Sequence, residues 1–374
     1  MLIYVAKPEA IGRKMLTQQA MRYLVEHLPR IDTITVIVES NGLCSARNLK
    51  SQSVEIVDEN GSSCKLELPH RIQINSGRKG LQISGPGCQT LRLRALKGAD
   101  TENISNNRSV NDAMMLLPQK WMRSDLQDSR KFEIHCAGCH YSLISDEDCS
   151  KISDLPSEFW TELMDYWHCH KPTTTDDAKI DRYSRLQPLA DELLVGSSQF
   201  QVSEKWGTGK LDFGGAYTRC AKCHRILGSA TKDSNLYSIN KWTVQLVKNG
   251  ITDNFSSELH VVSTLLNNLN CNGTRIVNLK SPDGDCHLLV WIFVVNVNVT
   301  IKNNQIMTNC IKIYYKTGSE SEQPSAGPNQ NIDQVSIDGP VLKDLIEKLD
   351  SINGDLPSNA RMMNSWKLGY LSPM

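Results

Sequence analysis

The sequence predicts a β-rich α+β protein, with an N-terminal part like a β-sandwich or barrel that carries zinc knuckles and a C-terminal α/β part. Three observations support this class. Short segments in the first third alternate apolar and polar residues, as strands with one buried face do. Two Cys-x-x-Cys pairs lie far apart in the chain, and the first follows a strand-like segment. Beyond residue 231, longer apolar strands alternate with amphipathic helical segments.

The N-terminal part is expected to begin with a helix and continue in strands. Residues 11–28 have the spacing of an amphipathic helix. Gly- and Asn-rich breaks separate the alternating segments that follow, and residues 98–112 are polar and predicted to be a loop. Ser157 can cap a helix whose aromatic residues continue to Trp167. The strands predicted here are 33–38, 64–68, 71–74, 91–94 and 131–135.

The pattern changes near residue 230, where we expect a domain boundary. This divides the chain into a β-rich domain, 1–230, and a C-terminal domain, 231–374. A polar segment over 318–333 has the composition of a flexible loop. The second part is predicted to contain strands over 236–247, 287–301 and 310–316, and helices over 256–270 and 341–349.

Composition excludes several classes of function. The chain has 374 residues, with 41 basic and 41 acidic side chains, so the basic excess of a general nucleic-acid binder is missing and no direct nucleic-acid contact is expected. The longest apolar run, 288–295, is much shorter than the roughly 20 residues of a membrane-spanning helix, so no membrane contact is expected either. The start lacks a signal-peptide core. The expected location is therefore cytoplasmic and nuclear, where the twelve cysteines stay reduced or bind metal.

The two Cys-x-x-Cys pairs are the clearest chemical feature. Cys136 and Cys139 form the first, and Cys220 and Cys223 the second. A two-residue gap lets both sulfurs of a pair face one ion, and two such knuckles make a closed four-thiolate site of the kind that binds structural zinc. The sequence therefore predicts zinc as a cofactor, held by Cys136, Cys139, Cys220 and Cys223.

Other interpretations of these pairs stay open. A neighbouring histidine, His135, His140 or His224, can replace a thiolate. Each pair is also literally Cys-x-x-Cys-His, the attachment sequence of c-type haem, although haem attachment requires export. A thioredoxin-like redox pair needs a helix starting at the first cysteine, whereas residues 141–144 resemble a strand. Plain buried thiols are the remaining alternative.

A second group of metal-capable side chains follows the aromatic helix. His168, Cys169 and His170 stand together just before Pro172, where a helix must stop. Cys169 can pack under Trp167, or act as a nucleophile whose thiolate a histidine promotes. It can also bind a metal on another protein, or complete this chain's own zinc site.

At these residues the chain resembles the HECT-like ubiquitin-protein ligase family, whose yeast-type members are factors important for polyadenylation. The resemblance extends over most of the chain from about residue 64, and the block 155–172 is its most specific part. The matching segments are 132–139 (FEIHCAGC), 155–160 (LPSEFW), 167–170 (WHCH), 220–228 (CAKCHRILG) and 356–365 (LPSNARMMNS).

The resemblance implies two activities. One is ubiquitin transfer with a ubiquitin-conjugating enzyme (E2), which would contact residues near 255–275, with Cys169 as the acceptor of the thioester and a cyclin-type protein as a possible substrate. The other is binding to the metallo-β-lactamase endonuclease of mRNA cleavage and polyadenylation, with Cys169, His168 and His170 presented to its zinc centre. The chain departs from a standard HECT domain because it has no Thr-Cys pair near its C terminus.

Overall fold

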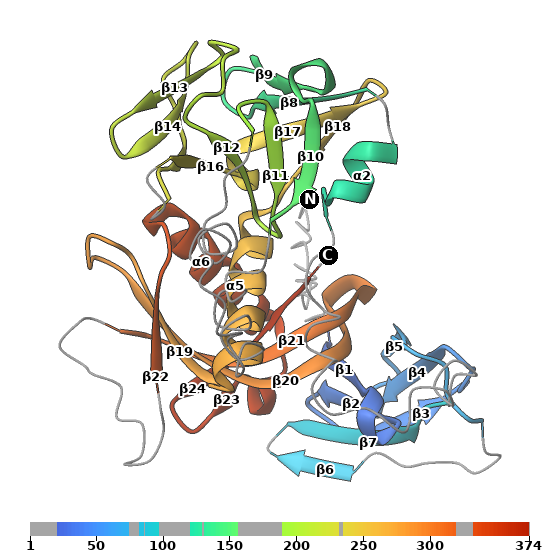
Figure 1. The fold of residues 1–374 in the computed structure, drawn as a ribbon. Coiled ribbons are helices and arrows are strands. Elements are labelled where there is room, and N and C mark those ends of the chain that lie inside the picture. The colour runs from blue at the N-terminus through green and yellow to red at the C-terminus, as the bar shows by residue number, and fades with distance from the viewer. Residues whose placement is uncertain are drawn as a thin grey trace, which may run out of the picture.

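The computed structural model describes residues 21–74, 82–85, 87–96, 120–128, 131–155, 189–231, 235–318 and 332–373. Strands dominate these residues, and most of the helical residues lie in the C-terminal part (Figure 1). The largest sheet curls into a half-barrel, so the β-rich α+β class predicted from the sequence is confirmed.

The largest sheet takes its ten strands from both ends of the described chain. The order is β23-β24-β21-β20-β1-β2-β7-β6, while β19 pairs with β20 and β22 pairs with β19. All these pairs are antiparallel except β19–β22. Its strands are β1 (Arg22–Leu28), β2 (Thr33–Glu39), β6 (Gln82–Gly85), β7 (Cys88–Arg94), β19 (Ile276–Lys280), β20 (His287–Ile301), β21 (Gln305–Gly318), β22 (Ile332–Ser336), β23 (Met362–Met363) and β24 (Trp366–Leu371).

Shorter sheets surround the cysteine pairs. The order β18-β17-β8-β9 forms one sheet, β10-β11-β12-β16 a second and β13-β14-β15 a third. These strands are β8 (Phe132–Cys136), β9 (Ser142–Ser145), β10 (Lys151–Asp154), β11 (Glu192–Val195), β12 (Gln199–Ser203), β13 (Leu211–Gly214), β14 (Tyr217–Cys220), β15 (Ile226–Ser229), β16 (Leu236–Asn240), β17 (Val244–Lys248) and β18 (Ile251–Asn254). A separate three-stranded sheet, near β1 and β2 in Figure 1, consists of β3 (Cys44–Arg47), β4 (Ser53–Asp58) and β5 (Ser63–Glu67).

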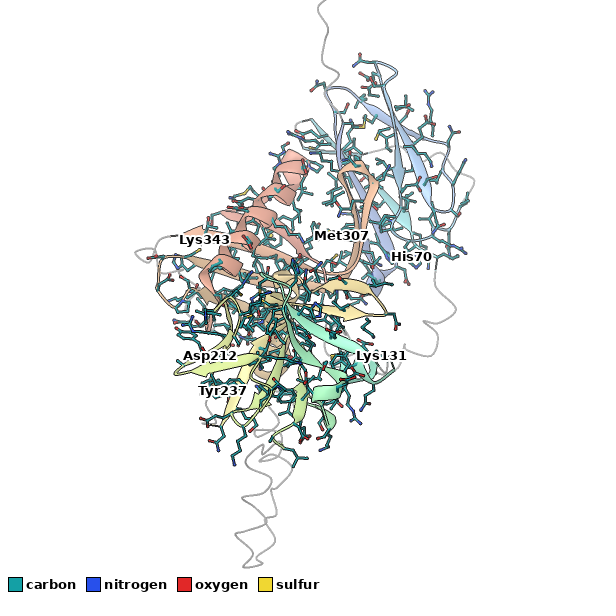
Figure 2. The ribbon with its side chains drawn as sticks, turned by 90° about the horizontal axis from the view of Figure 1, so that it is seen from above. His70, Lys131, Asp212, Tyr237, Met307 and Lys343 are labelled. Carbon is teal, nitrogen blue, oxygen red and sulfur yellow. The ribbon has the colours of Figure 1, made fainter. Side chains whose placement is uncertain are left out.

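The helix α5 (Ser257–Asn272) stands between the large sheet and the cysteine-bearing sheets (Figure 1). It starts where the Ser256 hydroxyl accepts a hydrogen bond from the Glu258 N–H, and it ends at Gly273, whose φ of 66° suits glycine. Apolar side chains of α5 share one core with α6 (Gly339–Asp355) and with the large sheet. A second core fills the cysteine-bearing part, where α2 (Arg123–Asp128) packs. Figure 2 shows both parts from another side, with Tyr237 in the cysteine-bearing part and Lys343 on α6.

Several predicted elements differ in detail from the structure. Residues 22–28, predicted to end a helix, form β1 instead, because pairing with β2 and β20 buries residues 23–27 on both faces of the strand. The strand predicted over 236–247 is two strands, separated by a 3-10 turn at Lys241–Thr243. The helix predicted over 341–349 is longer at both ends, and residues 71–74 form only an isolated bridge at Ile72. The loop predicted over 98–112 lies outside the described residues, as do residues 319–331 of the loop predicted over 318–333, whose last two residues begin β22.

Hydrogen bonds between strands cross the position predicted as a domain boundary. β1 pairs with β20, and β8 pairs with β17, so both parts of the chain contribute to the same sheets. The division at residue 230 stays a prediction. No helix in the described residues is long and apolar enough to pass through a membrane.

We expect acid to destabilise the fold through His27. Its side chain is 3% exposed, stacks on His70 with ring centroids 4.4 Å apart and accepts a hydrogen bond at Nδ1 from Asn298. Burial, and then the nearby His70, lower the pKa of His27 to about 4. The unfolded chain binds this proton near pH 6.5 and the folded chain does not, so about 2 kcal/mol of stability is lost as the pH falls from 6.5 towards 4. Urea unfolding at a series of pH values measures this loss. The free energy of unfolding should depend less on pH in His27→Phe than in the wild type.

Candidate metal centre

The first cysteine pair is held in a tight turn between two strands. Cys136 ends β8, opposite Val244 of β17, and β9 begins three residues after Cys139. The His140 N–H donates to the Cys136 carbonyl at 2.9 Å, and His140 has a φ of 56°. The Cys136 N–H donates to the carbonyl of Tyr141, which closes the hairpin. Because a strand follows the pair, the pair does not begin a helix as a thioredoxin-like redox pair does.

The second pair repeats this turn almost residue for residue. Cys220 ends β14, and the His224 N–H donates to its carbonyl at 2.8 Å. His224 has a φ of 57°, and the Cys220 N–H donates to the Arg225 carbonyl. Each Cys-x-x-Cys-His segment therefore folds into the same knuckle. The histidine in each occupies the left-handed position that turns the chain back into the next strand.

The two knuckles bring their four sulfurs together. Sγ of Cys136 lies 3.7 Å from Sγ of Cys223, and Sγ of Cys139 lies 3.7 Å from Sγ of Cys220. All four sulfurs lie within 4.8 Å of one another. A disulfide needs about 2.05 Å, whereas four sulfurs about 2.3 Å from a tetrahedral zinc are about 3.8 Å apart. The observed spacing fits this tetrahedron, and the cluster can hold a metal ion.

The electrostatics of the thiols also favour a cation. Burial raises the pKa of Cys136, and it raises that of Cys220 to about 12. The backbone N–H of Arg225 lowers the pKa of Cys223, which is exposed, to about 7. Without a cation, the Cys136 and Cys220 thiols therefore resist ionisation, whereas Cys223 ionises more readily than an ordinary cysteine. A divalent ion at the centre supplies the positive charge that four thiolates require.

Two basic side chains of the second knuckle cross over to the first. The guanidinium of Arg225 lies against Gly138, where an added Cβ would come within 3.1 Å of Nη1. Nζ of Lys222 lies 5.7 Å from the centre of the Tyr141 ring. Both cations offset the negative charge of a four-thiolate site. The sequence alone did not single out Lys222 and Arg225, although both stand next to the cysteines in the segment 220–225 (CAKCHR), and that position could have indicated their role.

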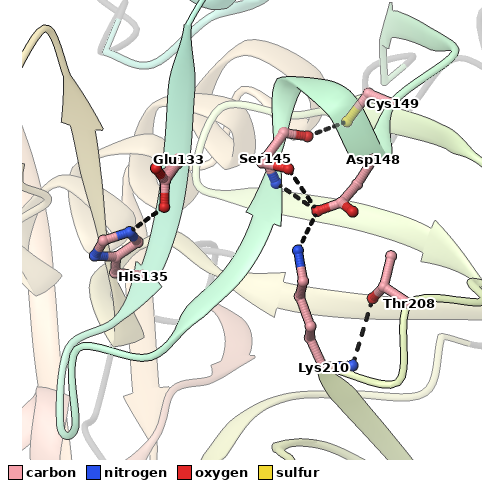
Figure 3. A network of polar contacts seen from close by, with 7 residues as sticks. All are labelled: Glu133, His135, Ser145, Asp148, Cys149, Thr208 and Lys210. Atoms are coloured by element: carbon pink, nitrogen blue, oxygen red, sulfur yellow. Dashed lines mark hydrogen bonds and ion pairs between the residues drawn. The ribbon is translucent and has the colours of Figure 1, made fainter.

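Two of the three histidines around the knuckles have other side-chain partners. Nε2 of His135 lies 2.7 Å from a Glu133 carboxylate oxygen, and Nδ1 of His140 lies 2.8 Å from the Gln245 amide oxygen. Figure 3 shows the Glu133–His135 contact beside a second polar group at the end of β9, in which Asp148 accepts from Ser145 and Lys210. The four cysteines are the metal-ligand group in the described residues, and neither of these histidines belongs to it.

Substitution of Gly228 is expected to disturb the strand that supports the second knuckle. A Cβ at Gly228 would lie 2.0 Å from the Ser238 carbonyl oxygen, because β15 crosses close to β16 there. Gly228→Ala must push these strands apart, so thermal or urea unfolding should show a loss of about 2–3 kcal/mol. Gly214→Ala is the matched control, since its Cβ would meet nothing closer than 3.8 Å. Equal stability of both variants would contradict the close crossing.

The remaining predicted site residues lie outside this part of the structure. His168, Cys169 and His170, and the helix predicted before them, fall between residues 155 and 189, which the structure does not describe. The three roles considered for Cys169 therefore stay predictions: a ligand in the four-sulfur cluster, a nucleophile, or a ligand presented to a partner. The structure brings together Cys136, Cys139, Cys220 and Cys223, as the sequence predicts.

Comparison with known proteins places the chain in a family. An uncharacterized protein of Saccharomyces cerevisiae, YJR141W, is 31% identical over 367 residues, covering 94% of this chain and 99% of that protein. The uncharacterized protein C1734.10c of Schizosaccharomyces pombe is 24% identical, covering 67% of this chain and 76% of that protein. An E3 ubiquitin-protein ligase of Rattus norvegicus is 21% identical, covering 81% of this chain and 84% of that protein.

No solved structure matches the chain. The sequence model of one family covers residues 26–368, which is nearly the whole chain and includes both knuckles. The chain therefore belongs to the HECT-like ubiquitin-conjugating enzyme (E2)-binding family.

Proposed function

We propose that this protein binds a ubiquitin-conjugating enzyme and acts as a HECT-like ubiquitin-protein ligase, with zinc at the four-cysteine centre. The observation that carries the proposal is the family match over residues 26–368, which names the E2 as the bound partner. Relatives described as ubiquitin-protein ligases support the second step. Zinc supplies structural cohesion here, because four protein ligands leave no open position for chemistry.

Four cysteines of the described residues that lie outside the cluster are poor acceptors for ubiquitin. Burial raises the pKa of Cys149 and Cys310 to about 12, and it also raises that of Cys64 and Cys286. A buried thiol with a raised pKa supplies little thiolate. The four knuckle sulfurs are assigned to the metal. These facts favour the sequence assignment of Cys169, which lies between two histidines that can accept its proton.

Ubiquitin transfer through Cys169 takes two steps. The Cys169 thiolate attacks the thioester carbonyl of the E2–ubiquitin conjugate, a new thioester forms, and the E2 cysteine leaves as a thiolate. An amine of the substrate then attacks that carbonyl, an amide forms, and the Cys169 thiolate leaves. His168 or His170 holds the proton that Cys169 gives up.

A charging assay tests this role. We expect the wild-type protein, mixed with charged E2 and run without reducing agent, to form a ubiquitin adduct that a thiol reagent removes. Cys169→Ala should abolish the adduct, and Cys88→Ala, a buried cysteine outside the cluster, should leave it intact. If Cys169→Ala retains the adduct and ubiquitin transfer, the catalytic assignment is wrong.

A second candidate function is a non-enzymatic one. The sequence His168-Cys169-His170 offers three metal-capable side chains in addition to the four cysteines of the cluster. It can bind the zinc centre of the metallo-β-lactamase endonuclease of mRNA 3′-end processing, as a chaperone or inhibitor, in the nucleus and cytoplasm. Thiolate binding would displace the water that a zinc hydrolase needs.

The same substitution tests this second function. If the protein acts only by binding the endonuclease, no ubiquitin adduct forms, and Cys169→Ala weakens endonuclease binding while zinc content and melting temperature stay unchanged. If the substitution instead removes zinc from the free protein, Cys169 is a ligand of its own centre.

A further inference from the structure

The four sulfurs of the metal centre differ in their access to solvent. Cys136 and Cys220 are 0% exposed and belong to the core of the cysteine-bearing part, and Cys139 packs against that core. Cys223 is exposed, and no other cysteine whose side chain the structure describes is exposed to this degree. A reagent that arrives from solvent therefore meets the centre first at Sγ of Cys223, because the other three sulfurs are buried or half-buried.

A second sulfur lies next to Sγ of Cys223, and it comes from the other knuckle. Sγ of Cys136 is 3.7 Å away, whereas a disulfide requires a separation of about 2.05 Å. Both sulfurs belong to turns and not to the middle of a strand, since Cys136 is the last residue of β8 and Cys223 follows the end of β14. The two sulfurs can therefore approach each other by movement of the turns.

Peroxide can join these two sulfurs in two balanced steps, because metal ligation keeps cysteines as thiolates and thiolates are the form that peroxides oxidise. The Cys223 thiolate attacks one oxygen of hydrogen peroxide, the O–O bond breaks, and Cys223 becomes a sulfenic acid while hydroxide leaves. The Cys136 thiolate then attacks Sγ of Cys223, the S–S bond forms, and a second hydroxide leaves. Each hydroxide takes a proton from solvent, so one peroxide is reduced to two waters while two thiolates are oxidised to one disulfide.

We propose that Cys223 and Cys136 form a peroxide-sensitive switch that opens the metal centre. The inference rests on the proposed zinc site and adds its regulation. Once the disulfide has formed, Cys139 and Cys220 are the remaining ligands, and two thiolates are too few for the four-coordinate site of a structural zinc. The centre then releases its metal, and the two knuckles lose the ion that joins them. A dithiol reductant returns both sulfurs to thiolates and so restores the site.

Peroxide treatment of the zinc-loaded, full-length protein tests this pairing directly. Released zinc is followed with a chromogenic chelator, and disulfide-linked peptides are mapped by mass spectrometry without reducing agent. We expect zinc release to accompany a disulfide between Cys136 and Cys223. Dimedone, which traps sulfenic acids, should label Cys223 before it labels any other knuckle cysteine. Reduction with dithiothreitol, followed by added zinc, should restore the melting temperature of the untreated protein.

Two matched histidine substitutions separate Cys223 from the rest of the centre. Cys223→His and Cys139→His each leave three cysteines and one histidine, a ligand set that also holds structural zinc. Only the first removes the exposed sulfur, so zinc release by peroxide should be slower by about tenfold or more in Cys223→His and should stay close to the wild-type rate in Cys139→His. If Cys223→His does not hold zinc, the disulfide and the dimedone label mapped in the wild type decide the question.

The outcomes distinguish the switch from the metal centre itself. If the purified wild-type protein holds no zinc, the proposed centre fails, and the switch fails with it. If the wild type holds zinc but peroxide releases none, or the mapped disulfide joins any other pair of cysteines, only the switch is overturned. Equal rates of zinc release in zinc-loaded Cys223→His and Cys139→His would also overturn it, because oxidation would then not begin at the exposed sulfur.

Discussion

With zinc at the four-cysteine centre, as we propose, Cys220→Ser is expected to remove the metal and to destabilise the cysteine-bearing part more strongly than substitutions elsewhere in the fold. Structural zinc sites contribute apparent binding free energies of about 10–16 kcal/mol in small domains, so losing one of four ligands should cost more than about 5 kcal/mol. The effect is large because the proposed ion would join two segments that are far apart in the chain, one ending β8 and the other ending β14. Calorimetry and metal analysis of the same sample measure both losses.

A matched control separates the metal centre from the loss of a buried thiol. Cys88 is 1% exposed and lies in β7, outside the cluster, so Cys88→Ala should keep its zinc and lose only about 1 kcal/mol. Chelation of the wild-type protein should reproduce the melting temperature of Cys220→Ser. If Cys220→Ser keeps one equivalent of zinc and wild-type stability, Cys220 is not a ligand.

Lys241→Met should give the second largest loss. Lys241 is 0% exposed, and Nζ donates to the carbonyl oxygens of Lys120, Trp121 and Gly196 at 3.0, 3.0 and 2.6 Å. It also donates to the Ser197 carbonyl at 3.3 Å. Burial lowers the pKa of Lys241 to about 7, and the charge of Asp125 opposes this shift.

Methionine fills the space of this lysine but donates no hydrogen bonds. Carbonyl oxygens left without a donor each cost about 1–3 kcal/mol, so we expect a total loss of about 3–5 kcal/mol in urea unfolding. Lys205, which is exposed, is the control, and Lys205→Met should change stability by less than about 0.5 kcal/mol. A Lys241→Met variant as stable as the wild type would show that Nζ does not hold these loops together.

Strands and knuckles could be predicted because each depends on a pattern of residues within one short segment of the chain. The strand predicted over 287–301 matches β20, because this segment contains a long apolar run whose side chains are mostly buried in the sheet. The cysteine pairs were predictable because the spacing within each pair is a local property. A four-thiolate metal site requires that the two pairs meet. In the structure, sulfurs of different pairs lie 3.7 Å apart.

Features that depend on distant segments could not be predicted. Helical spacing at residues 22–28 is real, but β2 and β20 bury both faces of this segment, and that pairing overrides local preference. Nothing near Lys241 in the sequence indicates burial, since its carbonyl partners come from two distant loops. The close approach of Gly228 to Ser238 likewise arises only once β15 and β16 are folded together.

X-ray absorption at the zinc edge of the purified protein tests the central claim, that four cysteines from two distant knuckles close one zinc centre. The account predicts one equivalent of zinc with four sulfur neighbours at about 2.3 Å and no nitrogen neighbour. A shell containing histidine nitrogen, fewer than four sulfurs, or a folded protein without zinc would contradict it.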